Sequence, residues 1–134
     1  MATDLPSDAQ SDDNPSPPQR FCILLHDHPY WHWDFLLENT DHALCWRLLR
    51  QPCAEEPIAA QKLPPHRLIY LDYEGPVSNQ RGTVKQIACG RYQVVSLSPV
   101  FSIRLEGLAW AQFASLDESN TDRVFWRFSG TSQL

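Results

Sequence analysis

The sequence lacks the long apolar runs, the excess of basic residues and the secretion signal that mark several common classes of protein. Its apolar segments fall far short of the roughly 18 residues that a membrane-spanning helix needs, so we expect no membrane partner. The net charge is −5, which argues against a protein that coats nucleic acid by general attraction. The N-terminus has no basic stretch followed by an apolar one, and we therefore expect a cytoplasmic protein.

Closely spaced cysteines are also missing. Cys22, Cys45, Cys53 and Cys89 stand far apart and form no C-x-x-C pair, which excludes a zinc knuckle. For a cytoplasmic chain, the expected state of these four residues is the reduced thiol.

The composition divides the chain into a tail and one domain. Residues 1–20 are rich in Asp, Pro and Ser and have little to bury, so we expect a disordered acidic tail. Four aspartates against one arginine give this tail a net charge of −3, which leaves −2 for the rest. A local basic groove in the domain of residues 21–134 is therefore compatible with the acidic total.

The domain has the pattern of short β-strands separated by turns, without a long helical period. This favours an all-β fold, either an antiparallel barrel or a sandwich, with a site at the open mouth of a barrel. The segment 51–65 carries four prolines and is expected to be a loop, with at most a short helical turn. The expected strands are 20–27, 30–38, 43–50, 66–71, 82–88, 89–97, 100–107, 108–114 and 123–129.

One expected strand has two polar side chains on one face and aromatic side chains on the other. On a strand, His32 and Asp34 point to the same side, whereas Trp33 and Phe35 point to the other. A tight turn can bring His26, at the end of the preceding strand, against His32. Two imidazoles and a carboxylate suit a divalent metal such as Mn²⁺ or Zn²⁺. The alternative is a pair of hydrogen-bonded surface histidines.

A second polar cluster follows the proline-rich segment. His66 and Tyr70 are four residues apart and share a face if this segment is a strand. By themselves they are equally typical of a capped strand end and a half-buried aromatic residue.

These two clusters resemble the 3′-phosphoesterase domain of bacterial DNA ligase D. Residues 26–38 are similar to its signature H-D-x4-H-Y-D-F-R-L-E, and residues 66–75 are similar to its H-P-L-D-Y-A-D-F-E-G. Trp46, the G-T-V at 82–84 and the segment 104–126 extend the resemblance over roughly residues 21–129.

The resemblance implies a small β-barrel enzyme that heals the 3′ ends of broken DNA. Such an enzyme removes a 3′-terminal ribonucleoside and then a 3′-phosphate with a divalent metal, usually Mn²⁺, although Zn²⁺ or Co²⁺ also fits. By motif position, His26, His32 and Asp34 are the expected metal ligands, and His66 and Tyr70 are expected at the scissile phosphate. The expected partners are nucleic-acid 3′ ends, DNA rather than RNA, and a separate ligase or end-joining protein.

Glu38 is expected to orient a ligand histidine by accepting its other ring N–H. Two arginines of the family's phosphate-binding set are replaced here by Leu36 and Ile58. Arg47, Arg50, Lys62, Arg67 and Arg81 are candidates to substitute for them, and Arg67 and Arg81 are the best of these because they flank the second cluster. The alternative for each is a solvated surface charge.

Three functions follow from this pattern. The first is a metal-dependent 3′-phosphoesterase, attenuated by the two lost arginines, because losing a donor aimed at the transition state costs on the order of 10²–10³ in rate. The second is a metal-containing module that binds nucleic-acid ends or a repair partner without turnover. The third is a structural or interaction domain that binds no metal.

The five tryptophans divide between core and surface. Trp31 lies in the turn before His32 and is expected to be an exposed stacking platform for bases. The others are expected in the core: Trp33, Trp46, Trp110 and Trp126.

Overall fold

The computed structural model describes residues 18–119 and 123–130, which form nine β-strands and one short 3₁₀ helix. Residues 1–17 of the expected tail lie outside the described residues, whereas Gln19 and Arg20 already belong to the first strand. No helix in this part of the chain has the length and apolar character needed to cross a membrane. The elements are β1 (Gln19–His26), β2 (His32–Glu38), β3 (Ala43–Leu48), β4 (Pro57–His66), η1 (Leu68–Leu71), β5 (Gly75–Pro76), β6 (Thr83–Ser96), β7 (Phe101–Glu106), β8 (Phe113–Asp117) and β9 (Val124–Ser129).

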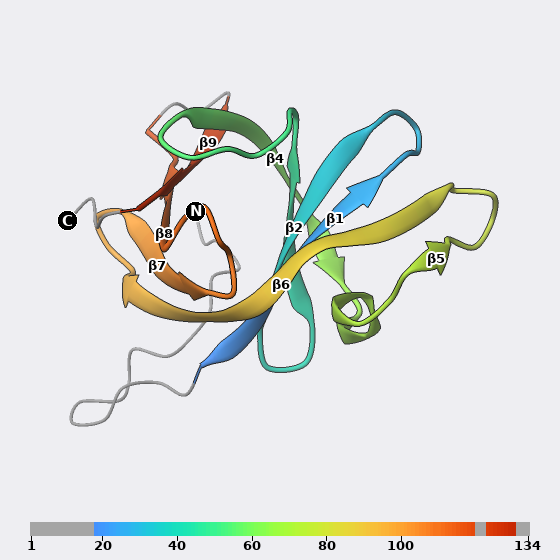
Figure 1. Cartoon of the computed structure of the whole chain (residues 1–134), viewed down its shortest axis with the longest axis horizontal. Coiled ribbons are helices and arrows are strands. Elements are labelled where there is room, and N and C mark those ends of the chain that lie inside the picture. The colour runs from blue at the N-terminus through green and yellow to red at the C-terminus, as the bar shows by residue number, and fades with distance from the viewer. Residues whose placement is uncertain (1–17, 120–122, 131–134) are drawn as a thin grey trace.

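Eight of these strands close into one antiparallel barrel, which confirms the all-β fold class. Their order is β1-β2-β3-β4-β9-β8-β7-β6, and β6 pairs back onto β1. The two-residue strand β5 adds only to the end of β6. Figure 1 shows β6 running across the molecule, from β7 on one side to η1 and β5 on the other. Closure of the barrel leaves few unpaired strand edges in the described chain.

The barrel interior holds the larger of two apolar clusters. Every second residue of the strands points inward, and Trp126 packs edge-on against both Phe35 and Trp46, with ring centroids 5.0 and 5.1 Å apart. Burying one such large side chain contributes about 1.5–3 kcal/mol. The expected core positions of Trp46 and Trp126 are confirmed, and Trp33 packs against the cluster.

The two remaining tryptophans lie at the surface. Trp31 is 63% exposed, as expected, although its role as a stacking platform stays a prediction. Trp110 is 39% exposed, so its expected place in the core was wrong. It lies in the turn before β8, where its ring centroid is 5.4 Å from that of Phe128.

A second, smaller cluster covers the outside of the barrel wall. It contains the outward residues Cys22 and Leu24 of β1, Leu36 of β2 and Cys45 of β3. The helix η1 lies over them and contributes the buried Leu71. The segment between β4 and β6 therefore forms a second layer that packs on the outer face of β1, β2 and β3.

Several expected element boundaries were wrong. The expected loop 51–65 contains most of β4, and the expected strand 66–71 is the helix η1. β4 tolerates its prolines because Pro57 is its first residue, and its pairing with β3 shifts where the other two prolines stand. The expected strands 82–88 and 89–97 form one strand, and the expected strand 108–114 is replaced by β8.

The expectation of four reduced thiols is contradicted by a disulfide between Cys22 and Cys89. These residues lie directly opposite each other on β1 and β6, with Cα atoms 4.2 Å apart. They are separated by 67 positions in the sequence, so only the closure of the barrel brings them together. Cys45 and Cys53 are free.

Candidate functional site

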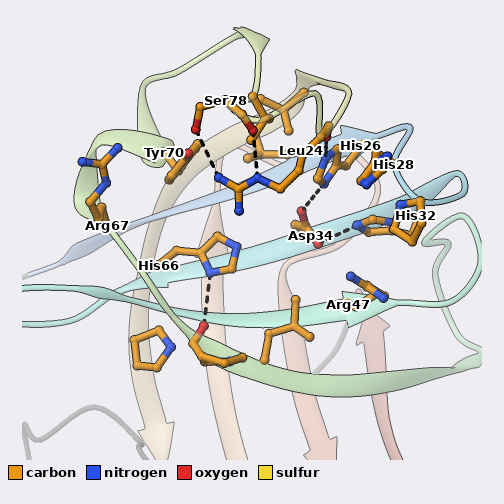
Figure 2. Close-up of a pocket in the computed structure, with 17 residues that line it drawn as sticks. Leu24, His26, His28, His32, Asp34, Arg47, His66, Arg67, Tyr70 and Ser78 are labelled. Atoms are coloured by element: carbon orange, nitrogen blue, oxygen red, sulfur yellow. Dashed lines mark hydrogen bonds and ion pairs between the residues drawn. The ribbon is translucent and has the colours of Figure 1, made fainter.

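The candidate site lies on the outer face of the barrel wall and not at the expected open mouth. His26, His32 and Asp34 alternate with interior residues, and thus share the outward face with Leu24 and Leu36. The structure over this face consists of the end of β4, η1 and the turn before β6. Between the two layers is a cavity of about 560 Å³ (Figure 2).

Three side chains of this cavity converge on one point. His26 and His32 are paired residues of the β1–β2 hairpin, and Asp34 follows two positions after His32. His26 Nδ1 lies 3.3 Å from one carboxylate oxygen of Asp34, and His32 Nε2 lies 3.1 Å from the other. One ligand atom from each residue lies within 4.8 Å of the others, so the three residues could hold a metal ion.

Backbone carbonyls fix the orientation of both imidazoles. His32 Nδ1 lies 2.9 Å from the carbonyl oxygen of Tyr30, and His26 Nε2 lies 2.8 Å from that of Arg81. Because a carbonyl can only accept, each of these nitrogens must carry the proton. In the neutral rings the opposite nitrogens, which face Asp34, then have free lone pairs, as metal binding requires.

The close approach of β6 depends on Gly82. Its φ angle is +80°, and an added Cβ would lie 2.2 Å from a side-chain oxygen of Asp27. Asp27 accepts a hydrogen bond from the backbone N–H of Thr83 at 2.8 Å, which ties the turn after β1 to β6. This contact places the Arg81 carbonyl against His26.

Two buried atoms at the centre of the cluster have no hydrogen-bond partner. They are His32 Nε2 and Asp34 Oδ1, in side chains that are almost fully buried. Such atoms are costly unless something satisfies them. Two imidazole nitrogens and a carboxylate oxygen are ligands that divalent metals accept, so the residues present fit a metal ion.

The electrostatics of the cluster keep Asp34 ionised. Burial by itself raises the pKa of this carboxyl group, but the imidazoles of His26 and His32 against its two oxygens outweigh that effect and lower the pKa to about 2. Once His26 is protonated, its Nδ1–H donates to Asp34, and this hydrogen bond raises the pKa of His26 above its usual 6.5. The metal-free cluster is therefore a carboxylate held between imidazoles.

The expected role of Glu38 was wrong. Its carboxylate accepts a hydrogen bond from the backbone N–H of Arg20 at 2.8 Å and lies 3.6 Å from the Arg20 guanidinium. Glu38 ends β2, four residues beyond Asp34. The ring nitrogens of His26 and His32 that point away from Asp34 bind backbone carbonyl oxygens and not Glu38. Its contacts fix the first residues of β1.

The structure brings His66 and Tyr70 to the same cavity as His26, His32 and Asp34. Their ring centroids are 5.8 Å apart, although the helix η1, rather than a strand, joins the two residues. His66 Nδ1 lies 3.1 Å from the carbonyl oxygen of Pro64. Figure 2 shows His66 and Tyr70 across the cavity from His32.

Cations dominate the cavity wall. Asp34 is the only carboxylate among the described residues that line it, against three arginines, Arg47, Arg67 and Arg81. Arg67 and Arg81, the preferred candidates for binding phosphate, both line this cavity, and that role stays a prediction. Arg47 was a less favoured candidate in the sequence, and the register of the hairpin between β2 and β3 places it opposite Asp34. A pocket of this charge suits an anionic ligand.

At the two positions where the family has arginines, this chain has buried apolar residues and no positive charge. Leu36 is fully buried in the outer cluster, and Ile58 is fully buried in the barrel interior. Any cation that serves a ligand in this cavity must therefore come from another position.

The structure is a small antiparallel barrel whose cationic pocket contains three residues that could hold a metal ion. The family of DNA ligase D 3′-phosphoesterase domains matches residues 25–125, about three quarters of the chain. The chain belongs to this family, as the resemblance of its motifs indicated. No curated protein matches the chain.

Proposed function

We propose that this protein is a metal-dependent 3′-end-healing phosphoesterase that acts on nucleic-acid ends bearing a 3′-phosphate or a 3′-ribonucleotide. The observation that carries the proposal is the cluster of His26, His32 and Asp34, in which the buried atoms His32 Nε2 and Asp34 Oδ1 have no hydrogen-bond partner among the described residues. It opens into the cavity that also holds His66, Tyr70 and three arginines, within the range that the family matches.

The donor set supports a divalent ion of borderline character, and we propose Mn²⁺, with Zn²⁺ or Co²⁺ as alternatives. Such an ion neutralises phosphate oxygens and lowers the pKa of bound water when it occupies the site. The protein supplies two oriented imidazoles and one carboxylate, and leaves the side towards the cavity for substrate.

The residues across the cavity act on the phosphate. His66 is held through Nδ1 by the Pro64 carbonyl, which leaves Nε2 to exchange a proton with a substrate or leaving oxygen. Tyr70 lies beside it and can donate its hydroxyl to a phosphate oxygen. The product would be a 3′-hydroxyl end, the chemistry that a separate ligase or end-joining protein requires.

The test is release of phosphate from a 3′-phosphorylated primer–template by the purified full chain with Mn²⁺. We expect a 3′-hydroxyl product that EDTA abolishes and that His32→Ala reduces at least 100-fold. His42→Ala is the matched control, because this histidine lies in the turn between β2 and β3, bonded to Asp41. Absence of product at high enzyme concentration would contradict the proposal.

A second function is a module that binds metal and 3′ ends without turnover. It is favoured by Leu36 and Ile58, two buried apolar residues that stand where the family has phosphate-binding arginines. It predicts tight, metal-dependent binding of the same primer–template and no product. A single-turnover reaction that His32→Ala eliminates would reject it.

A further inference from the structure

Arg47 lies directly beside the metal cluster, on the strand next to Asp34. The two residues are paired across the hairpin of β2 and β3, and Arg47 shares the outward face of β3 with Cys45. Figure 2 shows Arg47 next to Asp34 and His32, on the side of the cluster away from His26. Its side chain lines the cavity.

The guanidinium of Arg47 is held in place but not neutralised. It donates to the hydroxyl of Tyr30 at 3.3 Å and lies 5.6 Å from the centre of that ring. Its Nε is buried and has no hydrogen-bond partner among the described residues. No carboxylate in this part of the chain forms an ion pair with it. Tyr30 therefore fixes a cation whose charge remains available.

The other arginines differ in this respect. Arg20 is paired with Asp72 and Glu38, and Arg50 is paired with Glu56. Within the cavity, Arg81 is exposed and donates to Ser78 from two of its nitrogens. Arg67 is also exposed. Arg47 is thus the cavity arginine that is both partly desolvated and without a protein acceptor for Nε.

We infer that Arg47 is an anion-binding residue that holds a phosphoryl group of the substrate beside the metal cluster. It supplies from β3 the cation that Leu36 does not supply from β2. The planar fork of an arginine matches two phosphate oxygens, and a partly desolvated fork binds more strongly than one in water. This inference rests on the proposed function and names a residue that sets its substrate class.

The experiment measures the binding of inorganic phosphate and of Mn²⁺ to the full chain by two separate titrations. Phosphate is titrated both with and without Mn²⁺. Because a charge-assisted hydrogen bond is lost, Arg47→Gln should weaken phosphate binding about 10–100-fold. Mn²⁺ binding without phosphate should change less than about threefold. Arg47→Lys keeps the charge without the fork and should fall between Gln and wild type.

The matched control is Arg91→Gln, an exposed arginine on β6 outside the cavity, which should bind phosphate as the wild type does. If Arg47→Gln does not fold, Tyr30→Phe tests the same contact, since it removes only the hydroxyl that holds the guanidinium. It should weaken phosphate binding by about two- to fivefold.

The two titrations separate this inference from the proposed function. If phosphate binds the wild type and is lost in Arg47→Gln while no Mn²⁺ binds, the role of Arg47 holds and metal dependence fails. If the wild type binds no phosphate, or if the Arg47 and Tyr30 variants bind it as tightly as the wild type, the inference is overturned.

Discussion

His32 and Asp34 approach each other through atoms that have no other partner: Nε2 of the imidazole and Oδ1 of the carboxylate lie 3.1 Å apart in a buried position. The strand holds both side chains on one face, and the Tyr30 carbonyl fixes the imidazole from behind. The backbone thus holds an imidazole lone pair and a carboxylate oxygen where one divalent cation could contact both.

Divalent metal should stabilise the fold. A ligand that binds only the folded state at about 100 times its Kd adds about 2.7 kcal/mol, which raises the Tm of a domain of this size by roughly 10 °C. We expect this shift with Mn²⁺ in a thermal melt and its reversal by EDTA. Asp34→Asn should show no shift, whereas Asp41→Asn, in an exposed Asp–His pair, should respond as the wild type does. An equal shift in both variants would contradict a metal site at Asp34.

The metal-free protein should show a pH-dependent contribution from the same cluster. The pKa of Asp34 is lowered from 3.8 to about 2, so its ionised form stabilises the fold above about pH 4, and this is lost as the pH falls towards 2. The pKa of His26 is raised, so its protonated form stabilises the fold below about pH 6.5, and this is lost as the pH rises through the raised value.

The free energy of unfolding of wild type minus that of Asp34→Asn should therefore be greatest between about pH 4 and pH 6.5, at about 2 kcal/mol. Urea unfolding in EDTA at several pH values measures it. A difference that stays constant from pH 3 to pH 8 would show that Asp34 and His26 are not coupled.

Gly82→Ala should disturb the metal cluster from a distance. The residue has a positive φ angle, and the new Cβ would meet Asp27 and His28. We expect a loss of at least about 1–2 kcal/mol in stability and a severalfold weaker Mn²⁺ affinity, since the Arg81 carbonyl would move from His26. Gly130→Ala is the control, because no atom lies within 4 Å of its added Cβ. Equal Mn²⁺ affinity in the two folded variants would refute this link.

Leu36→Arg restores the family's residue but should not restore its function. Leu36 is fully buried in the outer cluster, and an unpaired charge there costs about 3–5 kcal/mol. We expect a strongly lowered Tm, whereas Leu36→Met, which conserves volume, should cost less than about 1.5 kcal/mol. A stable Leu36→Arg variant with enhanced phosphate release would show that the outer cluster can open to admit the guanidinium.

Strand alternation was sufficient to predict part of the site. The same period that places Trp33 and Phe35 towards the interior places His32 and Asp34 together, and the short turn brings His26 opposite them. Arg47, one of the less favoured candidates, could have been preferred on the same grounds, because a four-residue turn between β2 and β3 fixes its register with Asp34. The expectation for Glu38 failed because alternation gives the face of a side chain but not its partner.

The sequence by itself determined the all-β class, the family and the face on which His26, His32 and Asp34 lie in relation to the apolar core, because these follow from local periodicity and motif spacing. Only the tertiary structure decided that this face is the outside of the barrel, that η1 and the end of β4 cover it, and that Cys22 meets Cys89. Those features depend on the pairing of β1 with β6, which lie more than 50 residues apart in the chain. Contacts between such distant segments arise from closure of the whole barrel, and no short stretch of sequence encodes them.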